Sequence, residues 1–395
     1  MPSRKRQRIS LEYTLHNKVQ LIRAGNDYFN LVVEIIARAK ETIHFQTYIL
    51  DDDETGRQVI DALLAAVKRK VEVYLIVDAY ASHKLSKQFV KRLEDGGIHF
   101  RFFEPFFKSK HFYIGRRMHH KLLVADSRYC TVGGINIGNR YNDMPEQKAW
   151  LDFALYAEGD IAKQVCLLAR KTWKGFALQK RVKPCEAAPF TLKPEECSPV
   201  RLRRNDWVSS KNQISKTYRE ILLTAQSHVV FLCSYFMPGN LMKSYILKAL
   251  KRGVKVTVIM AGRSDVAISK NAERFMYDWL LRNKVEIYEY EENILHAKLA
   301  VCDSKWMTIG SYNVNNISAY ASVELNLDVK DACVAQHTEE VLKQIIRDSC
   351  VAVTQEDYVK TKNIFKQFIN WCSYEFVRLM LYLFTFYFRQ RKDKS

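Results

Sequence analysis

The sequence has few of the features that hold metals or build disulfide frameworks. Nine cysteines are spread over 395 residues, and no two of them form a C-x-x-C pair. This usage favours neither a zinc site nor a disulfide-rich fold, and it is typical of a reducing compartment such as the cytoplasm. We therefore expect no metal and no cofactor.

The chain also lacks an uninterrupted apolar run of about 20 residues, which is the length that a transmembrane helix needs. The basic segment 1–13 begins "MPSRKRQRIS" and is not followed by the apolar core of a secretion signal. One apolar stretch near the end, "FVRLMLYLFTFYF" from Phe376 to Phe388, contains Arg378 and is too short to span. We expect neither an export signal nor a membrane-spanning segment.

Acidic residues are the minority among the charges, with 43 Asp and Glu against 62 Lys and Arg, which leaves a net charge of +19. A protein with this excess is attracted to polyanions, whether nucleic acid, anionic lipid or phosphorylated substrates. The 48% hydrophobic content of a chain of this length can fill two cores of ordinary size. Two domains are therefore expected.

An internal duplication is the main feature that is present. The stretch "RRMHHKLLVADSRYCTVGGINIGNRY" returns as "ILHAKLAVCDSKWMTIGSYNVNN" without a gap. Five residues of the first copy have an identical residue 177 positions later. These pairs are His119 and His296, Lys121 and Lys298, Asp126 and Asp303, Gly133 and Gly310, and Asn136 and Asn313. A gap-free repeat of this kind indicates two structurally similar halves.

The duplication extends upstream of both copies. "TIHFQTYIL" and "HVVFLCSYFM" are short apolar runs rich in β-branched and aromatic residues, and each precedes an amphipathic segment and a second apolar run, "VEVYLIVDA" or "VKVTVIMAG". Each half therefore contains a βαβ unit. We predict an α/β fold of two similar halves, each a mixed, mostly parallel sheet flanked by helices, packed face to face with pseudo-twofold symmetry.

Proline marks the expected boundary, because four of the eight prolines fall between Pro184 and Pro199. The predicted organisation is a basic N-terminal segment (1–13), a first domain (14–180), a proline-rich linker (181–199), a second domain (200–350) and a basic amphipathic tail (351–395).

The repeated residues suit the chemistry of a phosphodiester. Residues two apart in a strand share a face, so His119 and Lys121 point the same way, as do His296 and Lys298. Lysine is a compact cation for phosphate oxygens, and the asparagine amide donates without charge. We expect Lys121, Lys298, Asn136 and Asn313 to bind the phosphate. One histidine attacks the phosphorus as a neutral nucleophile and the other protonates the leaving alcohol.

Each imidazole needs an acidic group that fixes its tautomer, and Asp152 and Glu324 stand at similar places in the two halves. Asp126 and Asp303 belong to the repeated motif and are counted with its catalytic residues, although their position in "ADSRY" and "CDSKW" also suits a role in bracing a turn. His120 has Ala297 as its counterpart, and we assign it no catalytic role.

The doubled pattern H-x-K-x4-D followed by G-[GS]-x-N resembles the phospholipase D superfamily, and "TYIL" with "DALLAAVKRKVEVYLIVD" resembles its bacterial cardiolipin synthases. The resemblance covers nearly all of residues 15–350 and implies phosphohistidine chemistry. It further implies that the nucleophile comes from the first copy, His119, with His296 as the acid and base. Members of the synthase group often begin with two membrane-spanning helices, which this chain lacks, so it resembles a shorter type that binds the membrane peripherally.

The tail and the aromatic residues favour lipid over nucleic acid as the partner of the basic surface. "FRFFEPFFKSKHFYIGRRMHHK" interleaves aromatic and basic residues next to the first motif, and Phe376–Phe388 lies between lysines and "RQRKDKS". The tail is typical of an interfacial helix at anionic headgroups, although a core helix folded onto the second domain is the alternative. We expect a peripheral enzyme at the cytoplasmic face of the membrane, with anionic phospholipid substrates and no nucleic-acid partner.

The expected reaction is transfer of a phosphatidyl group from a second phospholipid to phosphatidylglycerol, which forms cardiolipin. A phospholipase D hydrolase that releases phosphatidic acid, and a phosphodiesterase acting on nucleic acid, would use the same residues. A membrane-binding module without activity is a further alternative. The sequence gives no indication of the oligomeric state.

Overall fold

The computed structural model describes residues 9–104, 116–175, 185–207, 209–264, 266–315, 322–360 and 363–392, with side chains of the last helix up to Met380. Three sequence predictions therefore fall partly outside the described residues. They concern the basic segment 1–13, the aromatic and basic stretch that includes 105–115, and the end of the tail.

Both predicted βαβ units are present, because apolar strands that need cover on both faces alternate with amphipathic helices. In the first, β2 (Thr42–Thr47) and β3 (Glu72–Asp78) are parallel neighbours joined by α2 (Glu54–Lys68). Asp53 caps α2 by accepting a hydrogen bond from the Gly56 N–H. In the second, β11 (His228–Cys233) and β12 (Lys255–Ala261) are joined in the same way by α6 (Asn240–Lys251).

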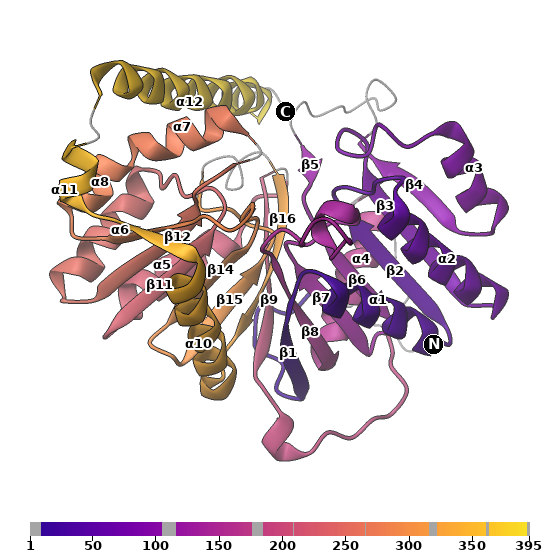
Figure 1. The fold of residues 1–395 in the computed structure, drawn as a ribbon. Helices are drawn as coiled ribbons and strands as arrows, with labels where there is room; N and C mark the ends of the chain where they lie inside the picture. The colour runs from indigo at the N-terminus through magenta and orange to yellow at the C-terminus, as the bar shows by residue number, and fades with distance from the viewer. Residues whose placement is uncertain are drawn as a thin grey trace.

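Each half is built around one mixed sheet (Figure 1). The first sheet has the strand order β1-β8-β7-β6-β2-β3-β4. Its other strands are β1 (Asn17–Arg23), β4 (His99–Phe103), β6 (Leu122–Ala125), β7 (Tyr129–Gly133) and β8 (Phe153–Gly159). The second has the order β10-β9-β16-β15-β14-β11-β12-β13-β17. Its other strands are β9 (Val200–Asp206), β10 (Lys211–Asn212), β13 (Glu286–Tyr290), β14 (Lys298–Cys302), β15 (Trp306–Gly310), β16 (Ser322–Val329) and β17 (Cys350–Val353).

The prediction of two similar α/β halves with mixed sheets is confirmed, but the expectation that the sheets would be mostly parallel is wrong. Among the described strands, β2, β3 and β4 run parallel, as do β11, β12 and β13, while the other neighbours in the two strand orders given above are antiparallel. The reason is that each repeated motif is a hairpin, and a hairpin adds antiparallel strands to the βαβ unit.

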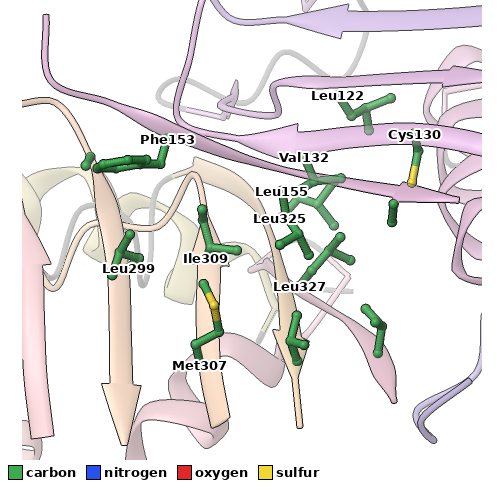
Figure 2. Close-up of a cluster of buried hydrophobic side chains, with 14 of the residues drawn as sticks. Leu122, Cys130, Val132, Phe153, Leu155, Leu299, Met307, Ile309, Leu325 and Leu327 are labelled. Carbon is green, nitrogen blue, oxygen red and sulfur yellow. The ribbon is translucent and has the colours of Figure 1, made fainter. Parts of the chain in front are cut away.

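The two sheets pack against each other through a shared apolar core (Figure 2). Leu122, Val132 and Leu155 of the first sheet lie in one buried cluster with Leu325 and Leu327 of the second. The side chains come from β6, β7 and β8 on one side and from β16 on the other. Because this cluster is continuous across the boundary, the halves are held face to face by burial of apolar surface.

Helices cover the outer faces and close the shared core. The first half carries α1 (Asn26–Arg38), α2 and α3 (Lys87–Asp95), and the second carries α5 (Gln213–Thr224), α6, α7 (Ala267–Phe275) and α8 (Tyr277–Arg282). Two helices cross between halves: α4 (Asp160–Trp173) packs on β6, β8 and β9, and α10 (Ala332–Ser349) packs on β14, β15 and β1. Each of these two helices thus contacts a strand of the opposite half, as the pseudo-twofold symmetry requires.

The chain ends with α11 (Gln355–Lys360) and α12 (Ile364–Lys392), and α12 lies along α7. The strand β17 pairs with β13, so the second sheet continues past residue 350, where the tail was expected to begin. The other domain boundaries stay a prediction, and β9 of the second sheet begins at Val200, directly after the proline-rich segment. None of the described helices combines the length and the apolar composition needed to cross a bilayer.

Candidate active site

The site forms where each half reaches into the other. The short strand β5 (Arg117–Met118) belongs to the first half by sequence but pairs in parallel with β16. Its place is fixed by the Met118 N–H, which donates to Asp78 Oδ2 at the end of β3 over 2.9 Å. The matching contact on the other side is a parallel bridge between Leu151 and Leu295. A histidine directly follows each of these contacts in the sequence: His119 follows Met118, and His296 follows Leu295.

The backbone N–H and the imidazole Nδ1 of His119 both contact the second half. Its N–H donates to the Val323 carbonyl oxygen over 3.0 Å, and its Nδ1 lies 2.9 Å from Glu324 Oε2. Glu324 is fully buried and also accepts a hydrogen bond from the Ser311 hydroxyl. Because an ionised carboxylate can only accept, the facing nitrogen is Nδ1–H, which leaves the lone pair on Nε2.

His296 is positioned by the first half in the same way. Its N–H donates to the Leu151 carbonyl oxygen over 2.8 Å, and its Nδ1 lies 2.6 Å from Asp152 Oδ2. Asp152 is fully buried at the start of β8. Both candidate orienting residues thus contact a histidine, but each contacts the histidine of the opposite half rather than its own.

The two lysines point back along their own strands toward the histidines. Lys121 Nζ donates to the His119 carbonyl oxygen over 2.9 Å, and Lys298 Nζ donates to the His296 carbonyl oxygen and to Ser234 Oγ. Both lysines are almost fully buried. Two buried ammonium groups are costly without an anion, so the arrangement favours a negatively charged ligand.

The histidines and lysines of the two motifs influence one another's protonation. Burial, followed by the neighbouring charge of Lys298, holds the pKa of Lys121 well below its ordinary value. Burial and Lys298 also lower the pKa of His296 to about 4. Burial lowers the pKa of His119, although Glu324 opposes that shift. The charged side chains of the two motifs are therefore near enough to influence one another.

Glu324 remains a carboxylate in this environment. Its burial alone would raise the pKa, but His119, Ser311 and Lys121 outweigh that effect and lower the pKa of Glu324 to about 2. A permanently negative group therefore stands behind His119, where it stabilises positive charge on the imidazole.

Comparison with known proteins agrees with this geometry. The sequence matches the family model described as cardiolipin synthase, PLD-like domain, over residues 32–151 and 218–346. The chain belongs to this family. It is 32% identical to cardiolipin synthase B of Salmonella typhimurium over 342 residues, which are 86% of this chain and 83% of that protein. It is 31% identical to cardiolipin synthase B of Shigella flexneri over 344 residues, with the same coverage.

The fold is shared with a solved phospholipid enzyme. The crystal structure of phosphatidylserine synthase from Haemophilus influenzae superimposes with a TM-score of 0.71 at 14% identity, over 95% of this chain and 97% of that chain. The resemblance to phospholipase D-like enzymes is thereby confirmed for the family and for the fold of both halves.

The asparagines of this cardiolipin synthase-like chain lie beside the site and support the segments that follow β2 and β11. Asn136 Oδ1 accepts from the Ile49 N–H over 3.1 Å, and its amide donates to the Tyr141 hydroxyl. Asn313 Oδ1 accepts from Ser234 Oγ over 2.8 Å. These bonds show a structural function for both amides, and direct binding of phosphate by them stays a prediction.

The structure gives Asp126 and Asp303 a structural function, and a catalytic role for them stays a prediction. The Asp126 carboxylate accepts three backbone N–H bonds from Lys40, Glu41 and Thr42. Asp303 accepts from the corresponding segment, Gln226 to His228. Each aspartate stands seven positions after its histidine, at the opposite end of β6 or β14. Each aspartate braces its hairpin turn, in which it and the next serine have positive φ.

The sequence patterns did not lead us to predict the aromatic residues that lie near the two histidines. The Tyr48 ring lies edge-on to His119 at 4.9 Å between centroids, and Lys121 Nζ lies 4.9 Å from the same ring. On the other side, Tyr141 and Trp150 lie near His296. The repeated "TYIL" and "SYFM" could have identified Tyr48, because both copies carry a tyrosine within two residues of the end of the first strand of the βαβ unit.

Two further observations concern groups around the site. His120 is buried and contacts Gln46 through Nδ1, away from the partners of His119. Within the described residues, no group of three or more His, Cys, Asp or Glu side chains is arranged to hold a metal ion.

Proposed function

We propose that this chain is a phosphatidyltransferase that forms cardiolipin from phosphatidylglycerol and a second phospholipid. Its relatives named cardiolipin synthase B support the reaction, because they match over most of both chains. The crossed pairing of His119 with Glu324 and of His296 with Asp152 is the observation that carries the mechanism. It supplies two oriented imidazoles, one from each half.

In the first step, His119 Nε2 attacks the phosphorus of the donor lipid. A P–N bond forms and the bond from phosphorus to the leaving alcohol oxygen breaks, while His296 gives that oxygen a proton. The positive charge that develops on His119 is stabilised by Glu324. The product of this step is a phosphatidyl-histidine.

In the second step, His296 takes the proton from a hydroxyl of phosphatidylglycerol. The alkoxide oxygen attacks the same phosphorus, the P–N bond breaks and His119 is restored. Lys121 and Lys298 stabilise the negative charge on the equatorial oxygens in both steps. Both histidines thus return to their starting protonation states.

Substrate binding also supplies the protonation that the first step requires. His296 must carry a proton, yet burial and Lys298 lower its pKa to about 4. A bound phosphodiester brings a negative charge next to both lysines, which offsets their repulsion and raises the pKa of His296. The acid is therefore formed when the lipid phosphate is present.

We propose further that the enzyme acts at the membrane surface as a peripheral protein on the cytoplasmic face, with anionic phospholipids as substrates. The net charge of +19 supports attraction to anionic lipids. Nucleic acid is not an expected partner.

Purified protein incubated with phosphatidylglycerol vesicles tests the function, with products identified by mass. Cardiolipin is the expected product. Phosphatidic acid without cardiolipin would indicate a hydrolase, and degradation of an oligonucleotide without any lipid product would indicate a nuclease. The His119→Ala variant should abolish turnover, and an unchanged rate would contradict the mechanism.

A further inference from the structure

The last helix of the chain, α12, packs on the protein through a face of mixed polarity, on which Val377 and Met380 are half-buried together with polar side chains. It lies along α7, and Tyr374 contacts Phe275 of α7 with 4.8 Å between ring centroids. Ser373 is the side chain of α12 that is buried most clearly. Gln367 and Asn370 lie on the same face of the helix by their spacing of three to four residues.

The opposite face of α12 is apolar and exposed. Phe368 and Phe376 are 58% and 50% exposed, and Leu379 is 54% exposed. They form one outer stripe with three further residues at helical spacing, Phe365, Ile369 and Cys372. A helix on the surface of a water-soluble domain normally turns its apolar side inward. In α12 an apolar stripe faces outward as well, and an exposed apolar surface of this kind marks an interaction site.

Hydrogen bonds and helix packing connect α12 to the edge of the second sheet where the active site lies. Lys298 of the site contacts Ser234, which follows the end of β11. Two residues later, the Phe236 N–H donates to Glu273 of α7 over 2.8 Å. Since α12 packs on α7, it occupies the same edge as the site, and Figure 1 shows it running along that side of the molecule.

The charge of the molecule favours a lipid surface over a second copy of the chain as the occupant. Lys366 and Arg378 flank the stripe on α12, and the sequence after Phe388 reads "RQRKDKS". Apolar residues bordered by cations are typical of helices that lie in the headgroup region of anionic membranes. Two chains of +19 each would repel one another across the same stripe.

We propose that the outer stripe of α12 is the membrane-docking surface, and that it inserts into the headgroup region of an anionic bilayer and turns the active-site edge toward the lipid. The proposal deepens the proposed function, since it rests on a phospholipid substrate. It identifies the outer face of α12 as the surface that contacts the lipid bilayer.

Binding to vesicles containing equal parts of phosphatidylglycerol and phosphatidylcholine tests the proposal. The double variant Phe368→Ser with Phe376→Ser should bind roughly a hundredfold more weakly, about tenfold for each ring, because tenfold corresponds to about 1.4 kcal/mol and burying a phenylalanine contributes at least that much. Both rings are exposed, so the variant should fold as the wild type does. Equal binding by the variant would overturn the proposal.

The chain offers matched controls. Leu379→Ser should weaken binding roughly tenfold, whereas Leu15→Ser should not, although Leu15 is similarly exposed at 59%. Leu15 precedes β1, whose first residue pairs with Gly159 at the end of β8 that is remote from Asp152. Equal losses in both leucine variants would show a nonspecific effect and contradict the proposal.

A fluorophore on an exposed cysteine reports insertion directly. A polarity-sensitive label on Cys372, with Cys333 replaced by serine, should become brighter and shift to the blue with vesicles. The reverse variant, with Cys372 replaced by serine and the label on Cys333, should not change. A shift that appears with protein concentration in the absence of vesicles would instead identify a second copy as the occupant and overturn the proposal.

Activity measurements distinguish a failure of the docking proposal from a failure of the proposed function. On monomerically dispersed short-chain phosphatidylglycerol, the double phenylalanine variant should turn over at the wild-type rate, and it should lose activity only on vesicles. If neither protein forms a lipid product, the proposed function fails while the binding results still decide whether the stripe docks.

Discussion

Replacing Glu324 by glutamine should slow turnover without changing the shape of the site. The carboxylate lies 2.9 Å from His119 Nδ1 and is fully buried. A hydrogen bond between charged partners contributes about 1.5–3 kcal/mol, against about 1 kcal/mol for a neutral one. Two charges about 4 Å apart near an effective dielectric constant of about 20 add about 4 kcal/mol. The variant loses this stabilisation when His119 becomes cationic.

We therefore expect kcat for Glu324→Gln to fall by about 10³–10⁴-fold, at about 1.4 kcal/mol for each factor of ten. Glu324 raises the pKa of His119, so the same variant should titrate His119 at lower pH. Cardiolipin formation, followed by mass, measures the rate, and rapid quenching of radiolabelled donor measures the phosphohistidine. Phosphohistidine should form more slowly in the variant.

Asp328→Asn is the matched control, because Asp328 is buried on the same strand and contacts Arg201 and Thr217 instead of a histidine. It should lower the free energy of unfolding but leave kcat of the folded enzyme within about threefold. Wild-type turnover in Glu324→Gln, or an equal loss of kcat in both variants, would refute the reasoning.

The remaining predictions concern the other charged groups of the motifs and the core between the halves. Lys121→Met should lower kcat/KM by about 10²–10³-fold and raise the pKa of His296, which Lys121 helps to lower. Because His296 must be protonated in the first step, the alkaline limb of the pH–rate profile should move to higher pH. Asp126→Ala and Asp303→Ala should each reduce the free energy of unfolding by about 1–3 kcal/mol in chemical denaturation and leave kcat unchanged. Leu325→Ala should cost about 2–5 kcal/mol, because it opens a cavity in the core between the halves. Finally, the pKa of His296 is about 4 in the folded state against an ordinary 6.5, so the unfolded chain takes up the proton first. The free energy of unfolding should therefore fall as the pH drops from 6.5 toward 4, less steeply in His296→Gln.

Most of what could be predicted about the fold and the candidate site came from the internal repeat. A gap-free doubling of the motif predicted two halves and two pairs of histidine and lysine, because the residues that bind and attack phosphate have few chemical alternatives. It could not predict the crossed carboxylates. Glu324 and Asp152 fall outside the 177-residue register, and whether each serves its own half or the other depends on how the sheets pack.

Local patterns were less informative where a residue type has two common functions. Asp126 belongs to the motif as firmly as His119 does, yet its carboxylate is occupied by backbone N–H groups at the far end of the hairpin. Similarly, the periodicity of α12 reveals an amphipathic helix but not which face is covered. Only the packing against α7 shows that an apolar stripe points outward.

The two half-sites differ in a way that gives a physical reason for different roles. Behind His119, the Glu324 carboxylate receives a hydrogen bond from Ser311. In the first half, glycine stands at the position of that serine, and a Cβ on Gly134 would approach Asp152 Oδ1 to 2.3 Å. The shorter aspartate thus occupies the space of the missing side chain and lacks the serine hydroxyl as a donor. Asp152 accepts from the Phe153 backbone N–H instead, over 2.7 Å, whereas the Ser311 hydroxyl helps to lower the pKa of Glu324 to about 2. Such a group suits the histidine that must become a cation when it binds phosphorus, which accords with His119 as the nucleophile. The other pair, His296 and Asp152, is then left for the residue that gives and takes a proton.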